Sequence, residues 1–441
     1  MSEPRIVWFV NHYATNQHRD GRSGRHEQFA RRLPDTGWRA VVISASTDHP
    51  SGRQTMRRGR LRERFVDDGH EFVWLRGVAY ARVRLFRIAD VLLFTALLLV
   101  PGMLHGLPRP DVVVGGSVHP LAAWAASLIA RRSRVPFVYE PRDLWPETLV
   151  QFGSIGRRSP IALALAAIER HCVRRAVVVV SPLEGAGRYY SARGLEAPFA
   201  WVPNGVSRQL VDEIEDDRGA TIGDTDTDTD TDTDHTFEIA YLGSMGTANS
   251  LAPVVDAFCV AAARLTGRRL VLRLVGTGPD RQRLEERAAA SRHASRIVFE
   301  GHLPQSEARA VGRRADALIA NLRPLELYRH GTSLNKFFEY LLLAKPVVLG
   351  ASVPRDPVTD SGAGVRVPGD DVPALADAIC RVATMSAPER LEHGARGRRH
   401  ALAHYDYDVL VARPAAALDR AIATPPPPPR RPGTGRRAAP W

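Results

Sequence analysis

The sequence predicts two doubly wound α/β domains, each built on a parallel sheet. Three observations support this fold class. Short apolar runs suit strands that are buried on both faces, helical patterns separate most of these runs, and a polar stretch at residues 212–236 divides them into two series. A chain of 441 residues is long enough for two cores, and its hydrophobic content of 44% is ordinary for a globular protein.

The first series of apolar runs predicts an N-terminal Rossmann-like domain over residues 1–206. Pro203-Asn204-Gly205-Val206 reads as the turn that closes this domain. We expect helices at 25–33, 121–131 and 160–174. We expect strands at 6–10, 40–44, 71–75, 111–115, 137–140, 176–181 and 199–202.

Residues 207–236 are predicted to be an acidic, low-complexity linker, because repeated Asp-Thr pairs without apolar residues cannot pack. The repeat lacks the glycine and the closing glutamate of an EF-hand, which argues against a calcium loop. A second Rossmann-like domain is expected over 237–405, followed by a helix at 406–424 that returns to the first domain and a disordered Pro/Arg-rich tail at 425–441. Its strands are expected at 238–243, 270–276, 297–301, 317–322, 346–350 and 364–367, with late helices at 372–385 and 388–404.

The formal net charge of +12 favours an anionic partner: nucleic acid, an anionic membrane surface or a phosphorylated substrate. The arginines are spread along the chain and are not gathered into one basic block with interleaved aromatics, which argues against nucleic acid. Cys172, Cys259 and Cys380 lie far apart, so neither a disulfide framework nor a metal site is expected. The chain begins on an apolar strand instead of a signal peptide, and we expect a cytoplasmic protein.

Residues 91–104 form the most apolar helical stretch, but it is short of the roughly 20 residues that a membrane span requires. Arg82, Arg84 and Arg87 precede it, which would suit a helix lying on anionic lipid. A core helix and a peripheral membrane contact through residues 82–104, at the inner face of the plasma membrane, both remain open.

Residues 331–350 combine a predicted helix start, a short amphipathic helix and a buried strand. Thr332 and Ser333 are good N-cap residues. Lys336 and Glu339 then lie three residues apart, where an ammonium near the helix start suits a phosphate and a carboxylate one turn later suits ribose hydroxyls. The alternative is a surface ion pair. Lysine stands only at 336 and 345 in this arginine-rich chain, which favours a site that needs a compact ammonium.

Six motifs, in this order and spacing, resemble the retaining family 4 glycosyltransferases of GT-B architecture. Within them the chain is similar to the bacterial branch that builds surface polysaccharides, such as the L-fucosamine (FucNAc) transferase-like enzymes. The motifs are Y-E-P-R-D-L-W-P-E at 139–147, V-P-N-G-V at 202–206, Y-L-G-S-M-G at 241–246, L-V-G-T-G-P at 274–279, F-E-G-H-L-P at 299–304 and S-L-N-K-F-F-E-Y-L-L-L-A-K-P-V-V at 333–348.

The resemblance implies that the C-terminal domain binds a nucleotide-sugar. It assigns Glu339 to the ribose hydroxyls and Lys336 to the donor phosphates. Ser244 and Asn249 stand where many members carry Arg and Lys, and Gly331 stands where they carry a first glutamate. The remaining donor-side candidates are Gly243, Gly246, Gly276, Gly278, Gly301, His302, Leu303, Arg329, Ser333 and Asn335.

For the acceptor side, the resemblance makes Asp143 the residue that orients or deprotonates the acceptor hydroxyl, with Arg142 beside it and Glu147 in reserve. The alternative is that Asp143 caps the following turn. Near predicted strand ends or in the first loop, the acceptor-side candidates are Gly24, Arg25, His12, His26 and His119.

The expected function is retaining transfer of a hexosyl or N-acetylhexosaminyl group from a nucleoside-diphosphate-sugar to an acceptor. A UDP-sugar is the favoured donor, and a lipid-linked glycan of surface polysaccharide synthesis is the expected acceptor. No cofactor or metal is expected. Two alternatives are a UDP-amino-sugar epimerase of the same architecture and a non-catalytic nucleotide-sugar-binding protein.

Overall fold

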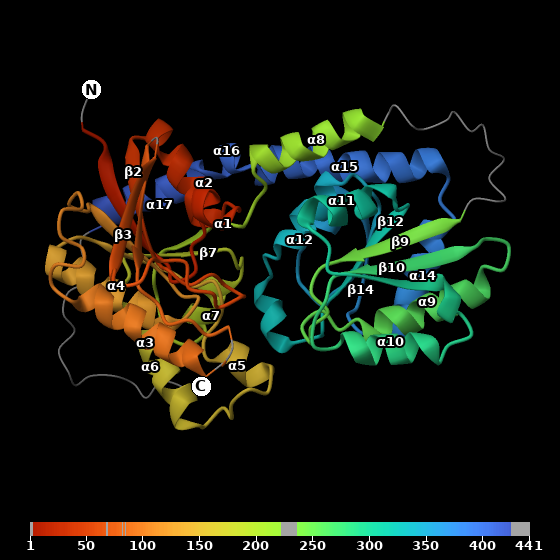
Figure 1. The fold of residues 1–441 in the computed structure, drawn as a ribbon, viewed down its shortest axis with the longest axis horizontal. Coiled ribbons are helices and arrows are strands. Elements are labelled where there is room, and N and C mark those ends of the chain that lie inside the picture. The colour runs from red at the N-terminus through yellow and green to blue at the C-terminus, as the bar shows by residue number, and fades with distance from the viewer. Residues whose placement is uncertain (1–2, 68, 82, 84, 222–235, 425–441) are drawn as a thin grey trace. The chain divides into compact units, whose positions relative to one another are not determined.

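The computed structural model describes residues 3–67, 69–81, 83, 85–221 and 236–424. Within these ranges the chain forms two compact units, one of the residues up to Asn204 together with those from Tyr407 onward, and one of Gly205–Asp406. Each unit is a sheet of mainly parallel strands with helices on both faces (Figure 1), so the predicted fold class is confirmed.

The first unit, called unit 1, contains an eight-stranded sheet. Its strands are parallel except for one antiparallel pair at the edge, β3 with β4. Along β1 the side chains alternate between the two faces, because Trp8 and Val10 pack into one core and Val7 and Phe9 into the other. The strand order is β3 (Arg62–Asp67), β4 (His70–Leu75), β2 (Trp38–Ala45), β1 (Arg5–Val10), β5 (Val112–Gly116), β6 (Phe137–Glu140), β7 (Val178–Ser181) and β8 (Phe199–Trp201).

Helices from both ends of the sequence cover this sheet. The last described segment of the chain, α16 and α17, packs into the same core as α2 and so completes unit 1. One face carries α3 (Phe86–Leu99), α4 (Pro120–Ser133) and α6 (Pro160–Arg175), and the other carries α2 (Arg25–Arg32), α16 (Tyr407–Leu410) and α17 (Ala412–Ala423). Shorter helices are α1 (Gln17–Asp20), η1 (Leu33–Thr36), α5 (Glu147–Gln151) and α7 (Ala186–Ser191).

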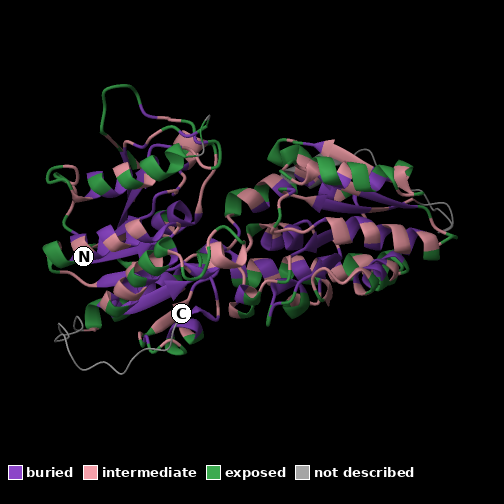
Figure 2. Cartoon of the chain, turned by 90° about the horizontal axis from the view of Figure 1, so that it is seen from below, coloured by how far each residue is buried: buried purple, intermediate pink, exposed green. Residues whose placement is uncertain are grey.

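The second unit, called unit 2, has six strands that are all parallel. Their order is β11 (Ile297–Gly301), β10 (Leu270–Val275), β9 (Phe237–Leu242), β12 (Ala317–Asn321), β13 (Val347–Gly350) and β14 (Gly364–Val367). The order runs outward in both directions from the neighbouring strands β9 and β12, so this is the switch point at which doubly wound sheets bind ligands. Figure 2 shows the buried strands lying between helices whose outer faces are exposed.

The helices of unit 2 also lie in two layers (Figure 1). One face of the sheet carries α9 (Ala252–Arg264), α10 (Arg281–Ala289) and α14 (Val372–Ala383), and the other carries α11 (Gln305–Arg314), α12 (Asn335–Leu342) and α15 (Ala387–Tyr405). Shorter elements are η2 (Ala294–Arg296), η3 (Glu326–His330) and α13 (Pro357–Ser361). The helix α8 (Arg208–Thr221) is joined to α11 by an ion pair between Glu213 and Arg309.

The structure differs from the sequence-based expectations in three places. Residues 208–221 form a helix where a linker was predicted, and the repeat at 222–235 and the predicted tail at 425–441 lie outside the described residues. The edge strand β3 was not predicted. The apolar helix begins at Phe86 instead of 91 and ends at Leu99, because Val100 precedes Pro101 and adopts an extended conformation. Among the described residues, no helix has the length and apolar content needed to cross a membrane.

A buried carboxyl group, Glu169 on α6, holds the segment that follows β6. Its Oε1 accepts hydrogen bonds from the Tyr190 hydroxyl at 2.9 Å and from the Trp145 amide at 3.1 Å. Oε2 has no hydrogen-bond partner among the described residues. Burial raises the pKa of Glu169 to about 8, so this group is protonated near neutral pH.

We predict that Glu169 makes unit 1 less stable as the pH rises. An unfolded glutamate ionises near pH ~4.3, so between that pH and about 8 the folded state holds a proton that the unfolded state has lost. Stability contributed by this group therefore declines across that window. In Glu169→Gln the thermal midpoint should decline less from pH 5 to pH 8.5 than in wild type, whereas the exposed-site control Glu196→Gln should follow wild type. Parallel profiles for wild type and Glu169→Gln would contradict the assignment.

Candidate functional site

Three glycines bring the ends of β9, β10 and β11 into backbone contact. The Gly276 amide donates to the Gly301 carbonyl at 2.7 Å, and the Gly243 amide donates to the Val275 carbonyl at 3.0 Å. Gly243 and Gly276 have φ angles of 143° and 129°. A Cβ atom on Gly276 would lie 2.0 Å from the Gly243 carbonyl oxygen, so only glycine allows these loops to meet.

The ammonium of Lys336, on α12, is bound to the loop that follows β9. Its Nζ donates to the Tyr241 hydroxyl at 3.0 Å and to Asn249 Oδ1 at 2.8 Å, and it lies 4.5 Å from the centre of the Tyr241 ring. The Tyr241 hydroxyl and Asn249 Nδ2 both donate to the Ser244 carbonyl. No carboxylate among the described residues forms an ion pair with Lys336. Burial lowers its pKa to about 7.

Glu339 lies one turn further along α12 and is half-buried. Within the described part of the chain, its carboxylate makes no hydrogen bond and no ion pair. Burial raises its pKa, and the charges of Arg309 and Lys336 act in the opposite direction. A carboxylate without a protein partner next to a held ammonium can accept hydrogen bonds from ligand hydroxyls.

The start of α12 is not capped as predicted. The helix begins at Asn335, its N-cap residue is Leu334, and no side chain caps it, so the prediction that Thr332 or Ser333 caps the helix is wrong. The Phe337 amide donates to the Leu334 carbonyl, whereas the amides of Asn335 and Lys336 remain donors for a ligand, at the helix end where the macrodipole favours an anion.

Asn321, the last residue of β12, lies on the other side of the switch point from the loop that follows β9. Its Nδ2 donates to the Ser250 carbonyl and to Asp370 Oδ1, both at 2.8 Å. A Cβ atom on Gly350 would lie 2.1 Å from Asn321 Oδ1. Sequence reasoning missed both Asn321 and Tyr241; the available signal was a polar side chain at the carboxyl end of a predicted buried strand.

Unit 1 carries a buried polar network at the corresponding edge of its own sheet. The carboxylate of Asp90, on α3, accepts hydrogen bonds from His12 Nε2 at 2.8 Å, Thr47 Oγ1 at 3.0 Å and the Val78 amide at 2.8 Å. His119 Nδ1 accepts from the Ala122 amide, so its Nε2 carries the proton and donates to His12 Nδ1 at 2.9 Å. One carboxylate thus ties α3 to the loops that follow β1, β2 and β4.

Two protein-family models match this chain, one in each unit. The glycosyl transferase 4-like domain matches residues 24–205, and the model of the glycosyl transferases group 1 matches residues 236–385. The second match contains the Lys336 site. The chain belongs to the GT-B glycosyltransferases.

Solved structures with the same fold cover nearly all of this glycosyltransferase. Sucrose-phosphate synthase from Thermosynechococcus elongatus superposes with a TM-score of 0.63 at 15% identity, over 95% of this chain and 99% of that one. The Escherichia coli trehalose-6-phosphate protein bound with UDP-2-fluoro glucose gives 0.66 at 12% identity, over 96% and 100%. Anabaena HepE in complex with UDP and glucose gives 0.58 at 13%, over 94% and 99%. No curated protein matches the sequence.

The structure of the glycosyltransferase places the donor-side candidates in three groups. Gly243, Ser244, Gly246, Asn249 and Lys336 come together at the end of β9. There Asn249 holds Lys336 and the Ser244 carbonyl. With Ser244, it stands where many members of the family carry Arg and Lys.

The second group follows β10 and β11. Gly276 and Gly278 pack against the β9 loop, since a Cβ atom on Gly278 would lie 2.3 Å from the Met245 carbonyl oxygen. His302 is exposed beyond Gly301. Leu303 lines a separate cavity of about 460 Å³ against α11.

The third group lies before and at the start of α12. Asn335 is exposed and Ser333 is half-buried. Arg329, on η3, is exposed and pairs with Glu326 at 2.7 Å. The guanidinium of this donor-side candidate therefore takes part in an ion pair at the surface.

On the acceptor side, Asp143 is exposed, and within the described ranges its carboxylate has no hydrogen-bond partner. Arg142, beside it, is half-buried. Glu147 is buried and pairs with Arg157 at 3.0 Å or less, while Arg193 lies 3.7 Å away, which favours a structural role for this reserve candidate.

The remaining acceptor-side candidates are largely internal. Gly24 is the N-cap residue of α2, and Arg25 and His26 follow it, buried against Glu140. Arg25 Nε lies 2.9 Å and His26 Nε2 lies 2.6 Å from the two Glu140 oxygens. His12 and His119 belong to the buried Asp90 network. The side chains of Arg25, His26, His12 and His119 are therefore buried beneath the loops of unit 1 and hold those loops in place.

We predict that the glycine contact at the ends of β9 and β10 is essential for the stability of unit 2. Gly276→Ala should lower the free energy of unfolding by about 2 kcal/mol or more, because the new methyl group meets the Gly243 carbonyl and the residue keeps a positive φ. Gly267→Ala is the matched control, since its Cβ atom meets open space, and it should stay within about 0.5 kcal/mol of wild type. Urea titration measures both values; equal costs would contradict the close contact.

Proposed function

We propose that this glycosyltransferase transfers a sugar, with retention, from a nucleoside-diphosphate-sugar to an acceptor hydroxyl. The favoured donor is a UDP-sugar carrying a hexose or N-acetylhexosamine. The favoured acceptor is a lipid-linked glycan of surface-polysaccharide synthesis, as in the branch that the L-fucosamine transferase-like enzymes represent.

The observation that carries this proposal is the position of Lys336. Its ammonium lies at the carboxyl end of β9, beside the switch point, with an uncapped helix start and the free carboxylate of Glu339 next to it. Ammonium and amides suit a diphosphate, and the carboxylate suits a ribose diol. Solved neighbours include the Anabaena HepE complexes with UDP and with UDP-glucose, which supports a nucleotide-sugar as the ligand.

The proposed reaction breaks the bond between the anomeric carbon and the β-phosphate oxygen and forms a bond from that carbon to the acceptor oxygen. Lys336 and the first-turn amides of α12 stabilise the charge on the departing diphosphate without a metal ion. Asp143, exposed after β6, orients the acceptor hydroxyl or takes its proton.

Contact with a membrane would bring a lipid-linked acceptor to unit 1. The start of α3 exposes large apolar side chains, with Leu85 71% and Ile88 59% accessible. These apolar side chains suit the interface of a bilayer. Arg82 and Arg84 lie outside the described residues.

We predict that removing either charge of the donor site weakens UDP binding. Lys336→Gln should raise the Kd for UDP about tenfold or more, since a charged hydrogen bond to phosphate is lost, and Glu339→Gln should weaken uridine and UDP alike. Lys345→Gln, at the only other lysine, is the matched control and should bind UDP as wild type does. Calorimetric titration measures all three.

The titration tests the phosphate assignment, and an assay of the products formed from a UDP-sugar separates transfer from the epimerase alternative. Wild-type affinity in Lys336→Gln would remove the phosphate assignment. Release of a free epimerised sugar from the donor, in place of transfer, would favour the epimerase.

We also predict that the affinity for UDP falls as the pH rises above about 7. The diphosphate binds the protonated ammonium, and the pKa of Lys336 near 7 means that each further pH unit reduces the protonated fraction about tenfold. Kd should therefore increase from pH 7.5 to pH 9, with net proton uptake on binding. Lys336→Arg should give a flat profile, because arginine stays charged. A wild-type profile as flat as that of Lys336→Arg would contradict the lowered pKa.

A further inference from the structure

Two aromatic rings and an arginine lie together at the carboxyl edge of the unit 1 sheet. The rings of Tyr13 and His49 are stacked, with centroids 4.3 Å apart and planes at 18°. Arg87 Nε donates to the Tyr13 hydroxyl at 3.1 Å, and its guanidinium lies 5.6 Å from the centre of the Tyr13 ring. Arg87 is exposed and has no acidic partner among the described residues.

A second arginine reaches the same place from another loop. Arg22 donates to Asp48 Oδ1 at 2.7 Å and to the His49 carbonyl, which ties the loop after β1 to the loop after β2. His49 is half-buried, and burial lowers its pKa to about 4, with the charges of Arg87 and Arg22 acting in the same direction. The imidazole is therefore neutral near pH 7, and its Nδ1 lies 3.1 Å from the Tyr80 hydroxyl.

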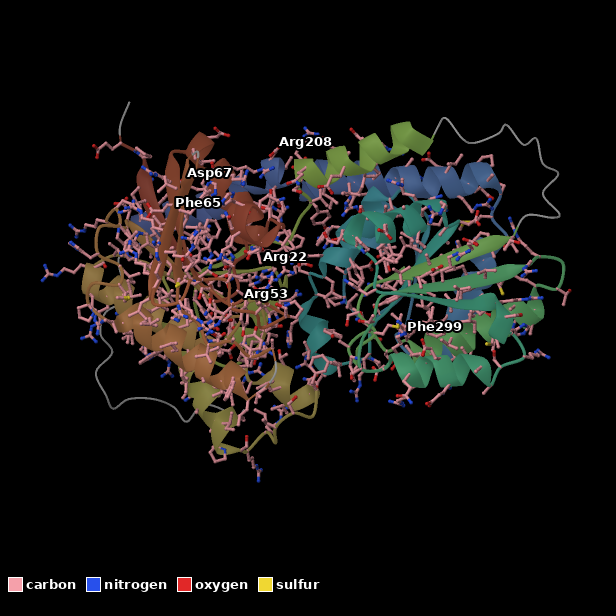
Figure 3. The ribbon with its side chains drawn as sticks, viewed as in Figure 1. Arg22, Arg53, Phe65, Asp67, Arg208 and Phe299 are labelled. Atoms are coloured by element: carbon pink, nitrogen blue, oxygen red, sulfur yellow. The ribbon has the colours of Figure 1, made fainter. Side chains whose placement is uncertain are left out.

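The buried Asp90 network holds these groups in place. Tyr13 follows His12, which donates to Asp90, and His49 follows Thr47, which does the same. Arg87 lies one turn before Asp90 on α3. Because β1, β2 and β4 are parallel, the loops after them lie at one edge of the sheet, where doubly wound folds bind ligands. Figure 3 labels Arg22 and Arg53 on these loops; Arg53 is exposed.

We propose that Arg22 and Arg87, with the stacked rings of Tyr13 and His49, bind an acceptor sugar that carries a phosphate group. This inference rests on the proposed function, in which unit 1 receives the acceptor, and it names the acceptor's chemical class.

The geometry favours a phosphate ester over a neutral sugar. Two guanidiniums that come from different elements can each meet a different oxygen of a tetrahedral phosphate. Tyr13 and His49 are both half-buried, so part of the stacked pair is accessible as an apolar surface for the sugar next to the phosphate. Asp48 balances the charge of Arg22 only, so the cluster keeps the positive charge of Arg87 for a ligand anion.

The test measures binding of N-acetylglucosamine 1-phosphate and of neutral N-acetylglucosamine to the full chain by saturation-transfer NMR. UDP at saturation blocks the donor site, and a parallel series uses Lys336→Gln so that phosphate binding near α12 cannot contribute. The phosphorylated sugar should bind about tenfold more tightly than the neutral one. Arg87→Gln should abolish that preference, and Tyr13→Leu should weaken both sugars.

Arg131→Gln is the matched control, because Arg131 is exposed near the C-terminal end of α4, at the opposite edge of the sheet, and it should keep the full preference. Thermal midpoints identify any variant that fails to fold, and Arg22→Gln then serves as the second test of the phosphate contact. Equal affinity for the two sugars, or equal losses in Arg87→Gln and Arg131→Gln, would overturn the proposal.

Binding to lipid vesicles distinguishes the two possible sources of the phosphate, a sugar phosphate and a lipid headgroup. If Arg87→Gln reduces binding to phosphatidylglycerol vesicles relative to phosphatidylcholine vesicles and leaves sugar phosphate binding unchanged, the arginine serves lipid headgroups and the proposal is overturned. If the affinity for UDP still depends on Lys336, the proposed function stands, whether or not the sugar phosphate proposal is overturned.

Discussion

The hydrogen bonds from the Lys336 ammonium to Tyr241 and Asn249 are the interaction on which the donor site depends. They join α12 to the loop after β9, across the switch point of the sheet, and hold a positive charge where the strands end. Gly243 favours this approach, because its φ of 143° suits glycine and a Cβ atom there would make a tight contact of 3.1 Å with Nζ. Burial and the absence of an ion-pair partner among the described residues leave this ammonium available for an anion.

Unit 1 uses a buried charge of the opposite sign in the same way. Asp90 accepts hydrogen bonds from His12, Thr47 and Val78, and so fixes three loops and α3 with one carboxylate. A buried carboxylate is costly unless several donors satisfy it, and this network supplies them. In both units a hydrogen-bonded charged group, Lys336 or Asp90, lies beneath the carboxyl ends of the strands. The outermost side chains of the loops remain available to bind ligands.

The buried parallel strands were predictable to within a few residues, because short apolar runs such as Val347-Val348-Leu349 are typical of strands that are buried on both faces. The edge strand β3 was not predicted. Its sequence, R-E-R-F-V-D, is rich in charged residues, as is common in exposed edge strands, and lacks the apolar run of a core strand. At the site, the sequence pointed to Lys336, Glu339 and the loop after β9, but not to the contacts that these residues make. Asn249 binds the lysine and Glu147 binds Arg157 through contacts that spacing along the chain does not reveal. Arg329 instead pairs with Glu326 three residues before it on η3, a local ion pair that the spacing could have indicated.

The most direct measurement uses the fact that the chain contains only two lysines. Protein labelled with ¹³C at the lysine Cε should show two lysine signals, which Lys336→Arg and Lys345→Arg assign. We expect the Lys336 signal to titrate near pH 7 without ligand and saturating UDP to move this midpoint upward by about one unit or more, while Lys345 is unchanged. If UDP saturates the protein and the Lys336 titration does not move, the ammonium is not at the diphosphate and the central claim is contradicted.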